Sequence, residues 1–296
     1  MMRSLYSGVS GLRNHQTRMD VIGNNIANVN TTAYKTSRTV FQDIYSQTIS
    51  AASAGTATLG GTNPSQIGLG VMLGTIDTLF TNGATQRTDN PSDLRIDGDG
   101  FFVIDINGTD PAGIKFTRAG NFYVDNVGKL VTSDGYFVMG YTLYTPGTGN
   151  PPTAGTVVPL PDLTDPAAME AGLAQIDLSA YTNISFDSTG TIWGYTAAGD
   201  KVAAAQIAMS MFTNNSGLEK AGGSLYNWSA SSGSPTYTIS GSQGAGGITP
   251  GALEMANVDL AAEFTDMIIT QRGFQANSRV ITVSDTLLEE LINLKR

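Results

Sequence analysis

Apolar residues recur every seven positions near both ends of the chain, with further apolar residues beside each stripe. A period of about 3.5 residues per turn is typical of the seam between coiled helices. We therefore predict one amphipathic helix at each end and expect the two to pack together or against copies of themselves. Two helices docked on a globular core are the alternative. The stripes are Leu5, Leu12, Met19 and Ile26, with Ile22 and Val29 beside them, and Leu260, Met267, Phe274, Ile281 and Leu288.

The first helix contains residues that form helices poorly. The stretch "VIGNNIANVNTTAYK" (21–35) includes Asn24, Asn25 and Asn28, and asparagine side chains compete for backbone hydrogen bonds. An isolated helix of this length is marginal in water. We therefore expect this segment to need neighbouring helices in order to become ordered.

The middle of the chain has a different pattern. "DLRIDGDGFFVID" and "FTRAGNFYVDNVGKLVTSDGYFVMGYTLY" alternate apolar and polar residues between Asp, Asn and Gly turns, which is typical of antiparallel hairpins. Residues 184–195 repeat the order strand, Asp-x-x-Gly turn, strand. The predicted fold class is α+β, with coiled-coil-like terminal α-helices and a separate, mainly antiparallel β domain.

Three connecting stretches separate these segments. Residues 50–70 are small, polar and glycine-rich and predict a long loop or extended arm. Residues 145–170 are proline-rich and predict an irregular surface segment, and 229–251 form a Ser/Gly run before a helix that Asn257 or Asp259 could cap. The predicted domains are a terminal helical domain (1–32 and 255–296), a connecting arm and extended segment (33–90), and a β-rich domain (91–254).

Composition narrows the functional class. The formal net charge is −9 and no Lys/Arg cluster occurs, so we expect no nucleic-acid partner. The chain has no cysteine, which excludes disulfides and thiolate chemistry. No apolar run is long enough for a membrane span or a Sec-type signal peptide. We therefore expect no membrane insertion, and export by a route that needs no cleavable signal.

The sequence contains no recognisable catalytic or metal-binding pattern. His15 is the only histidine, so neither a Ser-His-Asp triad nor a histidine metal cluster can form. "DGDG" (97–100) looks like part of a calcium loop, but Phe101 stands where a third oxygen ligand belongs. We expect no catalytic, cofactor-binding or metal site, and we expect that the protein is not an enzyme.

Two long terminal motifs carry a family resemblance. "SLYSGVSGLRNHQTRMDVIGNNIANVNTTAYK" and "ALEMANVDLAAEFTDMIITQRGFQANSRVITVSDTLLEELINLKR" resemble the N- and C-terminal motifs of the bacterial flagellar rod and hook family, and the central blocks resemble those of the family in the same order. The resemblance is closest to the hook type, because "GNNIANVNT", "QRGFQANSRVITVSD" and the opening "MMRSLYSGVSGLR" look hook-like. The chain departs from that type at residues 145–183, where many hook proteins carry large outer domains, and so resembles a short form. The distal rod type is the alternative, because the arm at 46–70 has a counterpart there.

This resemblance implies a structural role. Proteins of the family are exported unfolded through the flagellar type III apparatus and polymerise into a tube whose channel is lined by the terminal helices. The implied function is a subunit of the hook, a flexible joint between rod and filament, located outside the cell in the flagellar hook or basal body. The implied partners are further copies of the chain, the distal rod protein, hook cap and hook–filament junction proteins, and the export apparatus.

The candidate assembly residues are therefore the apolar stripes together with Asn24, Asn25 and Asn28. Asn24 and Asn28 lie one turn apart and could form hydrogen bonds across subunits or line a polar channel; ordinary solvation is the alternative. A secreted binding module whose termini dock on its own β domain is the alternative functional class.

Overall fold

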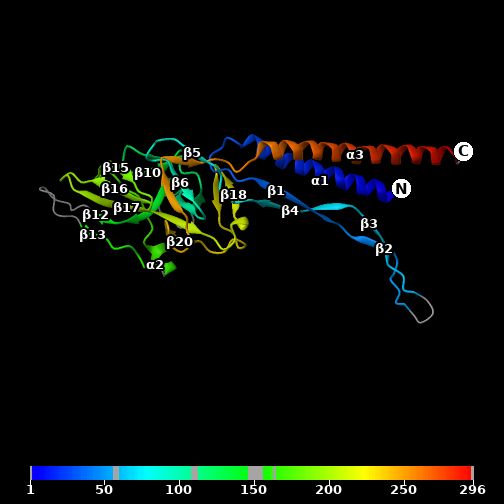
Figure 1. The fold of residues 1–296 in the computed structure, drawn as a ribbon, viewed down its shortest axis with the longest axis horizontal. Helices are drawn as coiled ribbons and strands as arrows, with labels where there is room; N and C mark the ends of the chain where they lie inside the picture. The colour runs from blue at the N-terminus through cyan, green and yellow to red at the C-terminus, as the bar shows by residue number, and fades with distance from the viewer. Residues whose placement is uncertain (1, 56–59, 108–112, 146–155, 163–164, 295–296) are drawn as a thin grey trace. The chain divides into compact units, whose positions relative to one another are not determined.

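The computed structural model describes residues 2–55, 60–107, 113–145, 156–162 and 165–294. It has a long helix at each end and antiparallel strands between them (Figure 1), so the predicted α+β class is confirmed. The elements are α1 (Met2–Ala27), β1 (Ser37–Asp43), β2 (Ser46–Ser50), β3 (Ser65–Gly68), β4 (Val71–Thr78), β5 (Thr85–Arg87), β6 (Leu94–Asp97), β7 (Phe101–Asp105), β8 (Ile114–Thr117), β9 (Phe122–Val124), β10 (Leu130–Thr132), β11 (Phe137–Thr142), β12 (Tyr144–Thr145), β13 (Thr156–Val157), α2 (Pro166–Ala171), β14 (Ala174–Gln175), β15 (Thr182–Phe186), β16 (Thr191–Tyr195), β17 (Lys201–Met211), η2 (Asn215–Gly217), β18 (Glu219–Gly222), β19 (Leu225–Asn227), β20 (Thr236–Ile239), β21 (Gly247–Pro250), β22 (Ala252–Glu254) and α3 (Leu260–Asn293).

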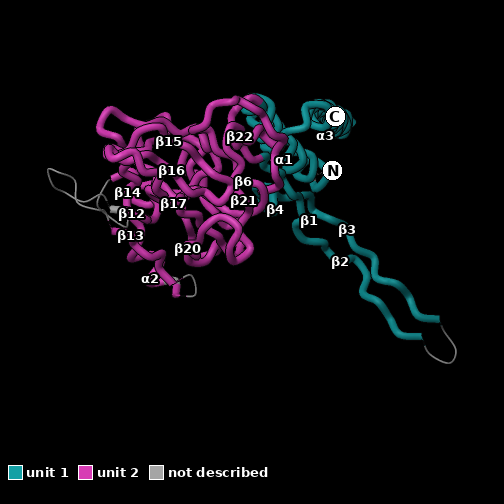
Figure 2. Tube along the Cα trace, turned by 60° about the vertical axis from the view of Figure 1, so that its left-hand side comes forward, with its two compact units in different colours: residues 1–29, 36–79, 258–296 teal, residues 30–35, 80–257 magenta. Residues whose placement is uncertain are grey.

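The chain forms two compact units, each built from segments that are distant in sequence (Figure 2). Unit 1 comprises residues 1–29, 36–79 and 258–296, and unit 2 comprises residues 30–35 and 80–257. The segment 33–90, which we expected to be one connecting arm, is therefore shared between the two units. The three-part division drawn from the sequence stays a prediction about roles in assembly.

In unit 1 a two-stranded ribbon accompanies the helices. Strands β1 and β4 pair antiparallel from Ser37↔Thr78 to Asp43↔Val71, and β2 pairs with β3 from Ser46↔Gly68 to Ser50↔Ser65. Figure 2 shows the two segments of the chain that form this ribbon running side by side. The arm predicted for 50–70 is thus the outer part of a hairpin; residues 56–59 of that prediction lie outside the described residues.

The strands of this ribbon were not predicted, because they lack the usual pattern of a half-buried strand. The residues of β2 and β3 are almost all exposed. With neither face packed against a core, alternation of apolar and polar residues has no physical cause.

Helix α3 begins where the sequence indicated. Asp259 is its N-cap, and the carboxylate accepts hydrogen bonds from the backbone N–H groups of Ala261 (2.9 Å) and Ala262 (3.3 Å). Of the two predicted caps, Asp259 is therefore confirmed. The cap satisfies two amide groups that have no partner inside the helix.

Unit 2 is an antiparallel sheet buried on both faces. Its strands follow the order β15-β16-β17-β11-β7-β8-β19-β18, with β20 also pairing β17. All five residues of β7 are buried. Phe102 packs in one apolar cluster, whereas Phe101 and Val103 pack in another. Because neighbouring side chains on a strand point to opposite faces, the central strand contributes to two cores at once.

Two Asp-x-x-Gly turns form the hairpins that the repeat predicted. The amide of Gly128 donates to the carbonyl of Asp125 (2.9 Å), and the amide of Gly190 donates to that of Asp187 (3.0 Å). Both glycines have positive φ, +87° and +74°, which glycine adopts without strain. The resemblance between these segments thus reflects a shared turn geometry.

The proline-rich stretch contains more order than we expected. Its described part includes β13 and the short helix α2, where Asp165 caps the amide of Ala167 (3.0 Å) and Met169 is fully buried. Residues 146–155 and 163–164 of the predicted surface segment lie outside the described residues.

A buried ion cluster ties together segments of unit 2 that are far apart in sequence. Lys35 and Glu254 form an ion pair of 2.6 Å, and both side chains are inaccessible to solvent. The same carboxylate accepts from the amide of Gly83 (2.9 Å) and from the Arg118 guanidinium (3.4 Å), while Lys35 also donates to the carbonyl of Thr81 (2.7 Å). Burial lowers the pKa of Lys35, and the Glu254 carboxylate opposes this shift.

Candidate functional site

The two terminal helices pack antiparallel along each other in unit 1 (Figure 1). A Cβ atom at Gly11 would lie 2.6 Å from the side-chain nitrogen of Asn277, and one at Gly273 would lie 2.7 Å from the ring of His15. A Cβ at Gly8 would touch Ile281 at 3.4 Å. The space beside Gly11 and Gly273 is thus filled by side chains of the facing helix, and a larger residue at either position would have to displace Asn277 or His15.

The row of α3 that faces inward is polar and small. Thr270 and Ser284 are its only buried residues among those described, and Glu263 and Asn277 are partly buried. These four positions are themselves seven residues apart. The predicted period is therefore present, but the innermost row is offset from the apolar stripe that we expected to form the seam.

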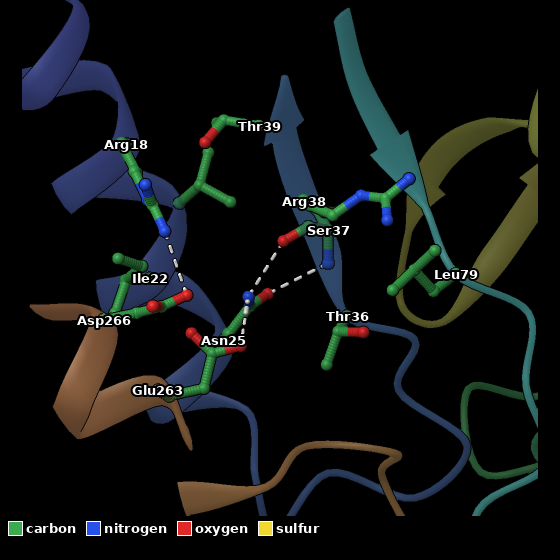
Figure 3. A pocket seen from close by; sticks show the side chains of 11 residues that line it. Arg18, Ile22, Asn25, Thr36, Ser37, Arg38, Thr39, Leu79, Glu263 and Asp266 are labelled. Atoms are coloured by element: carbon green, nitrogen blue, oxygen red, sulfur yellow. Dashed lines mark hydrogen bonds and ion pairs between the residues drawn. The ribbon is translucent and has the colours of Figure 1, made fainter. Parts of the chain in front are cut away.

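Asn25 joins three segments at one end of the helix pair (Figure 3). Its side-chain amide donates to the carbonyl of Ser37 (2.9 Å) and to the carboxylate of Glu263 (3.0 Å), while its oxygen accepts from the amide of Ser37 (3.1 Å). Asn25 is only 2% exposed. These bonds connect α1 to the start of β1 and to the first turn of α3.

A small polar pocket of about 170 Å³ lies beside these bonds (Figure 3). Arg18 pairs with Asp266 at 3.0 Å on its wall. Burial raises the pKa of Glu263, and the hydrogen bond from Asn25 opposes that shift. Burial also lowers the pKa of His15, with a smaller effect in the same direction from Arg18. Because the lining residues Asn25 and Arg18 of α1 bond to Glu263 and Asp266 of α3, we interpret the pocket as part of the contact between the two helices.

The structure distributes the predicted assembly residues over three environments. On α1 and just after it, Ile22 and Asn25 are buried, and Asn24 is exposed. The Asn28 amide donates to the backbone carbonyl of Asn24 (2.9 Å) and to its side-chain oxygen (2.8 Å). The remaining positions are partly buried at Leu5, Leu12, Met19, Ile26, Asn28, Val29, Met267, Ile281 and Leu288, and exposed at Leu260 and Phe274.

The assembly role of these residues stays a prediction, because the structure contains one copy of the chain. Leu260 and Phe274 are 40% and 39% exposed, so they are available for contacts beyond the helix pair. Helix α3 also exposes an apolar set that the sequence reading did not single out. Its members are Phe264, Ile268, Ile269, Val283, Leu291 and Ile292, exposed by 49–68%.

The sequence did contain a signal for the inner row. Glu263, Thr270, Asn277 and Ser284 repeat at the same interval as the apolar stripe. Small and polar residues are seldom read as a packing face, since burial is usually associated with apolar side chains. The glycines on the facing helix were the missing indication of close packing.

The described residues hold no group of three or more His, Cys, Asp or Glu side chains placed to bind a metal ion. No helix in the described ranges is sufficiently long and apolar to cross a bilayer.

Three family models match successive parts of the chain. "Flagella basal body rod protein" matches residues 5–35, "Flagellar hook protein FlgE/F/G D1 domain" matches 95–194, and "Flagellar basal body rod FlgEFG protein C-terminal" matches 249–294. The first and last matches contain most of the helix pair.

Individual relatives agree with these matches. The flagellar basal-body rod protein FlgG of Bacillus subtilis strain 168 is 47% identical over 297 residues, covering all of both chains. The flagellar hook protein FlgE of Borreliella burgdorferi is 32% identical over 445 residues, again covering all of both chains. The hook protein FlgE of Helicobacter mustelae is 49% identical over 142 residues, covering 48% of this chain and 31% of that protein. The chain thus belongs to the bacterial flagellar rod and hook family.

Proposed function

We propose that this protein is a structural, non-enzymatic subunit of the flagellar basal-body rod that polymerises with copies of itself. The observation that carries the proposal is the 47% identity to a rod protein over the whole of both chains. Alignment to the Borreliella hook protein spans 445 positions against the 296 residues of this chain, so that relative contains long segments with no counterpart here.

The hook, which the sequence resemblance favoured, is the second candidate. A specific observation supports it, since 142 residues of the chain are 49% identical to part of the Helicobacter hook protein. Both candidates share the same building principle, a tube of repeated subunits. They differ in position along the flagellum.

Apolar residues that remain exposed on α3 support polymerisation. Phe264, Ile268, Val283 and Leu291 lie on α3 with 49–59% of their surface exposed. Complete burial of one such side chain is worth roughly 1.5–3 kcal/mol. Contact with neighbouring copies would bury these residues and stabilise both α3 and the junction at Asn25.

The partners and location follow from this proposal. The subunit contacts copies of itself along the tube, and it meets other flagellar proteins at the ends of its segment, including distal rod, hook cap and hook–filament junction proteins where these adjoin it. It passes through the flagellar type III export apparatus and functions in an extracellular flagellar structure.

Polymerisation is tested with the purified chain. Val283→Asp places a charge among the exposed apolar residues of α3 and is expected to abolish tube formation, since an unpaired buried charge costs several kcal/mol. Val283→Leu keeps the position apolar and is the control, expected to polymerise normally. Normal tubes from Val283→Asp would remove Val283 from the interface.

Deletion of the gene separates the two candidates. A rod subunit is required for the rod itself, so basal bodies isolated from the deletion strain are expected to carry a truncated rod. A complete rod without hook or filament would contradict the rod assignment and support the hook.

A further inference from the structure

Unit 2 carries an aromatic groove, and no residue of α3 lines it. The groove has a volume of about 410 Å³ and is lined by Ile114, Phe116, Glu170, Trp228, Ser234, Pro235 and Tyr237. These residues come from β8, from α2, from the segment between β19 and β20, and from β20 itself. Helix α2 lies against β20, so a side chain of α2 and a ring of β20 can share one wall (Figure 1).

The groove is apolar on its floor and carries one charge. Phe116 and Tyr237 are buried, whereas Trp228 is 55% exposed. Glu170 is exposed and is the one charged side chain among the described residues that line the groove. Burial raises the pKa of Tyr237 to about 12, and the Glu170 carboxylate adds to that rise. Because Glu170 and the aromatic residues line the same groove, its carboxylate and the aromatic floor can contact the same ligand.

We propose that this groove binds a lysine or arginine side chain of a second copy of the chain. Such a side chain has a hydrocarbon stem that packs on Trp228 and Pro235 and a cationic head that pairs with Glu170. A purely apolar partner would leave the carboxylate without a counter-charge. An acidic side chain entering the groove would be repelled by it.

The chain already uses the same contact within unit 2. Cations lie 4.8–5.6 Å from aromatic ring centres in four described pairs, which are Lys129 over Phe137, Lys201 over Trp193, Lys220 over Tyr34, and Arg118 over Phe101. The groove offers the same aromatic face to a cation from outside. A second copy is the occupant because this inference rests on the proposed homopolymer, and each copy carries exposed cations, among them Arg13 and Arg279.

The test uses Trp228 as a reporter. The chain has two tryptophans, so Trp193→Phe leaves Trp228 as the only one. On polymerisation of this variant, Trp228 emission is expected to shift to shorter wavelength and its quenching by acrylamide to fall. Normal polymerisation with unchanged Trp228 emission overturns this inference alone. Failure to polymerise overturns the proposed function, and with it the second copy as the occupant.

The charge requirement is tested separately. Glu170→Gln is expected to raise the critical concentration for polymerisation roughly tenfold while leaving thermal unfolding of the monomer unchanged. Glu219→Gln, at an exposed position on β18, is the matched control and should leave the critical concentration unaltered. An unaltered critical concentration for Glu170→Gln contradicts the proposal.

The kind of side chain or ligand that the groove prefers is tested by adding small probe molecules to the unpolymerised chain. N-acetyl-arginine amide is expected to change Trp228 emission in the Trp193→Phe chain at millimolar concentration and to lose this effect with Glu170→Gln. A response to a neutral oligosaccharide such as an N-acetylglucosamine trimer, without a response to the arginine probe, would identify a glycan groove and overturn the proposal.

Discussion

The β sheet of unit 2 and helix α3 of unit 1 differ in how far their apolar residues are exposed to solvent. Leu94, Phe102 and Ile207 in unit 2 have no accessible surface. In α3, the buried described residues are Thr270 and Ser284, while Phe264 and Ile268 are 50% and 59% exposed. The sheet is thus complete within one chain. The helix pair buries Ile22 but leaves a set of apolar residues on α3 exposed.

This difference separates two tasks. A domain that buries its apolar residues gains its stability before any partner arrives. A helix pair that exposes them gains much of its stability only on association, in keeping with the marginal stability of isolated helices. Substitutions in the two regions should therefore have opposite profiles, with large effects on the monomer in unit 2 and large effects on the polymer in unit 1.

The largest expected effect on the monomer comes from the sheet core. Phe102→Ala should lower the free energy of unfolding by about 3–5 kcal/mol, because Phe102 is fully buried. Phe264→Ala, at a half-exposed position on α3, should change it by less than about 0.5 kcal/mol. Denaturant unfolding of the full chain measures both. Equal losses of unfolding free energy in the two variants would contradict the difference inferred between the two units.

The next effect concerns the buried ion cluster. Glu254→Gln removes the carboxylate that accepts from Lys35, Arg118 and Gly83, and it leaves two buried cations without a counter-charge. We expect a loss of about 3 kcal/mol in the unfolding of unit 2. Glu219→Gln, which is exposed, is the control. A loss no larger than that of the control would show that the cluster contributes little.

A smaller, local effect is expected at the end of the helix pair. Asn25→Ala removes the hydrogen bonds to Ser37 and Glu263 and should cost about 1–2 kcal/mol. Hydrogen exchange should show faster exchange of the Ser37 amide, which loses its acceptor. Asn24→Ala, at an exposed position, should leave that amide protected. Unchanged protection in Asn25→Ala would contradict the role of Asn25 as the junction.

The smallest effect is a pH dependence from Glu263. Its pKa is raised from the ordinary 4.5 by burial, so the folded helix pair binds this proton more tightly than the unfolded chain does. This difference in pKa stabilises the folded helix pair. The stabilisation is fully present below about pH 4.5 and is lost as the pH rises through the pKa that Glu263 has in the folded state. Glu263→Gln should remove this slope in hydrogen exchange of α3 between pH 4 and 7. The control Glu289→Gln should retain it.

Much of the architecture could be inferred from local pattern. The Asp-x-x-Gly turns, the Asp259 cap and the alternation in 93–144 each depend on interactions between near neighbours, so the sequence indicates them directly. The paired ribbon of β1–β4 and β2–β3 was missed, because strands without a buried face carry no alternation. The bonding partners of Asn25 were also missed, since Ser37 and Glu263 are brought to it by folding.

By itself, the sequence determined the helical period at both ends, the antiparallel β domain and the family, because these depend on spacing and on local chemistry. Only the tertiary structure decided which row of α3 faces α1. The stripe at Met267 and Phe274 and the row at Thr270 and Asn277 have the same period, so spacing alone cannot choose between them. The choice is made by contacts between residues that are distant in sequence, since the space beside Gly11 on α1 holds the side chain of Asn277. Thr270 is buried in that arrangement, whereas Phe274 stays 39% exposed and available to a neighbouring copy.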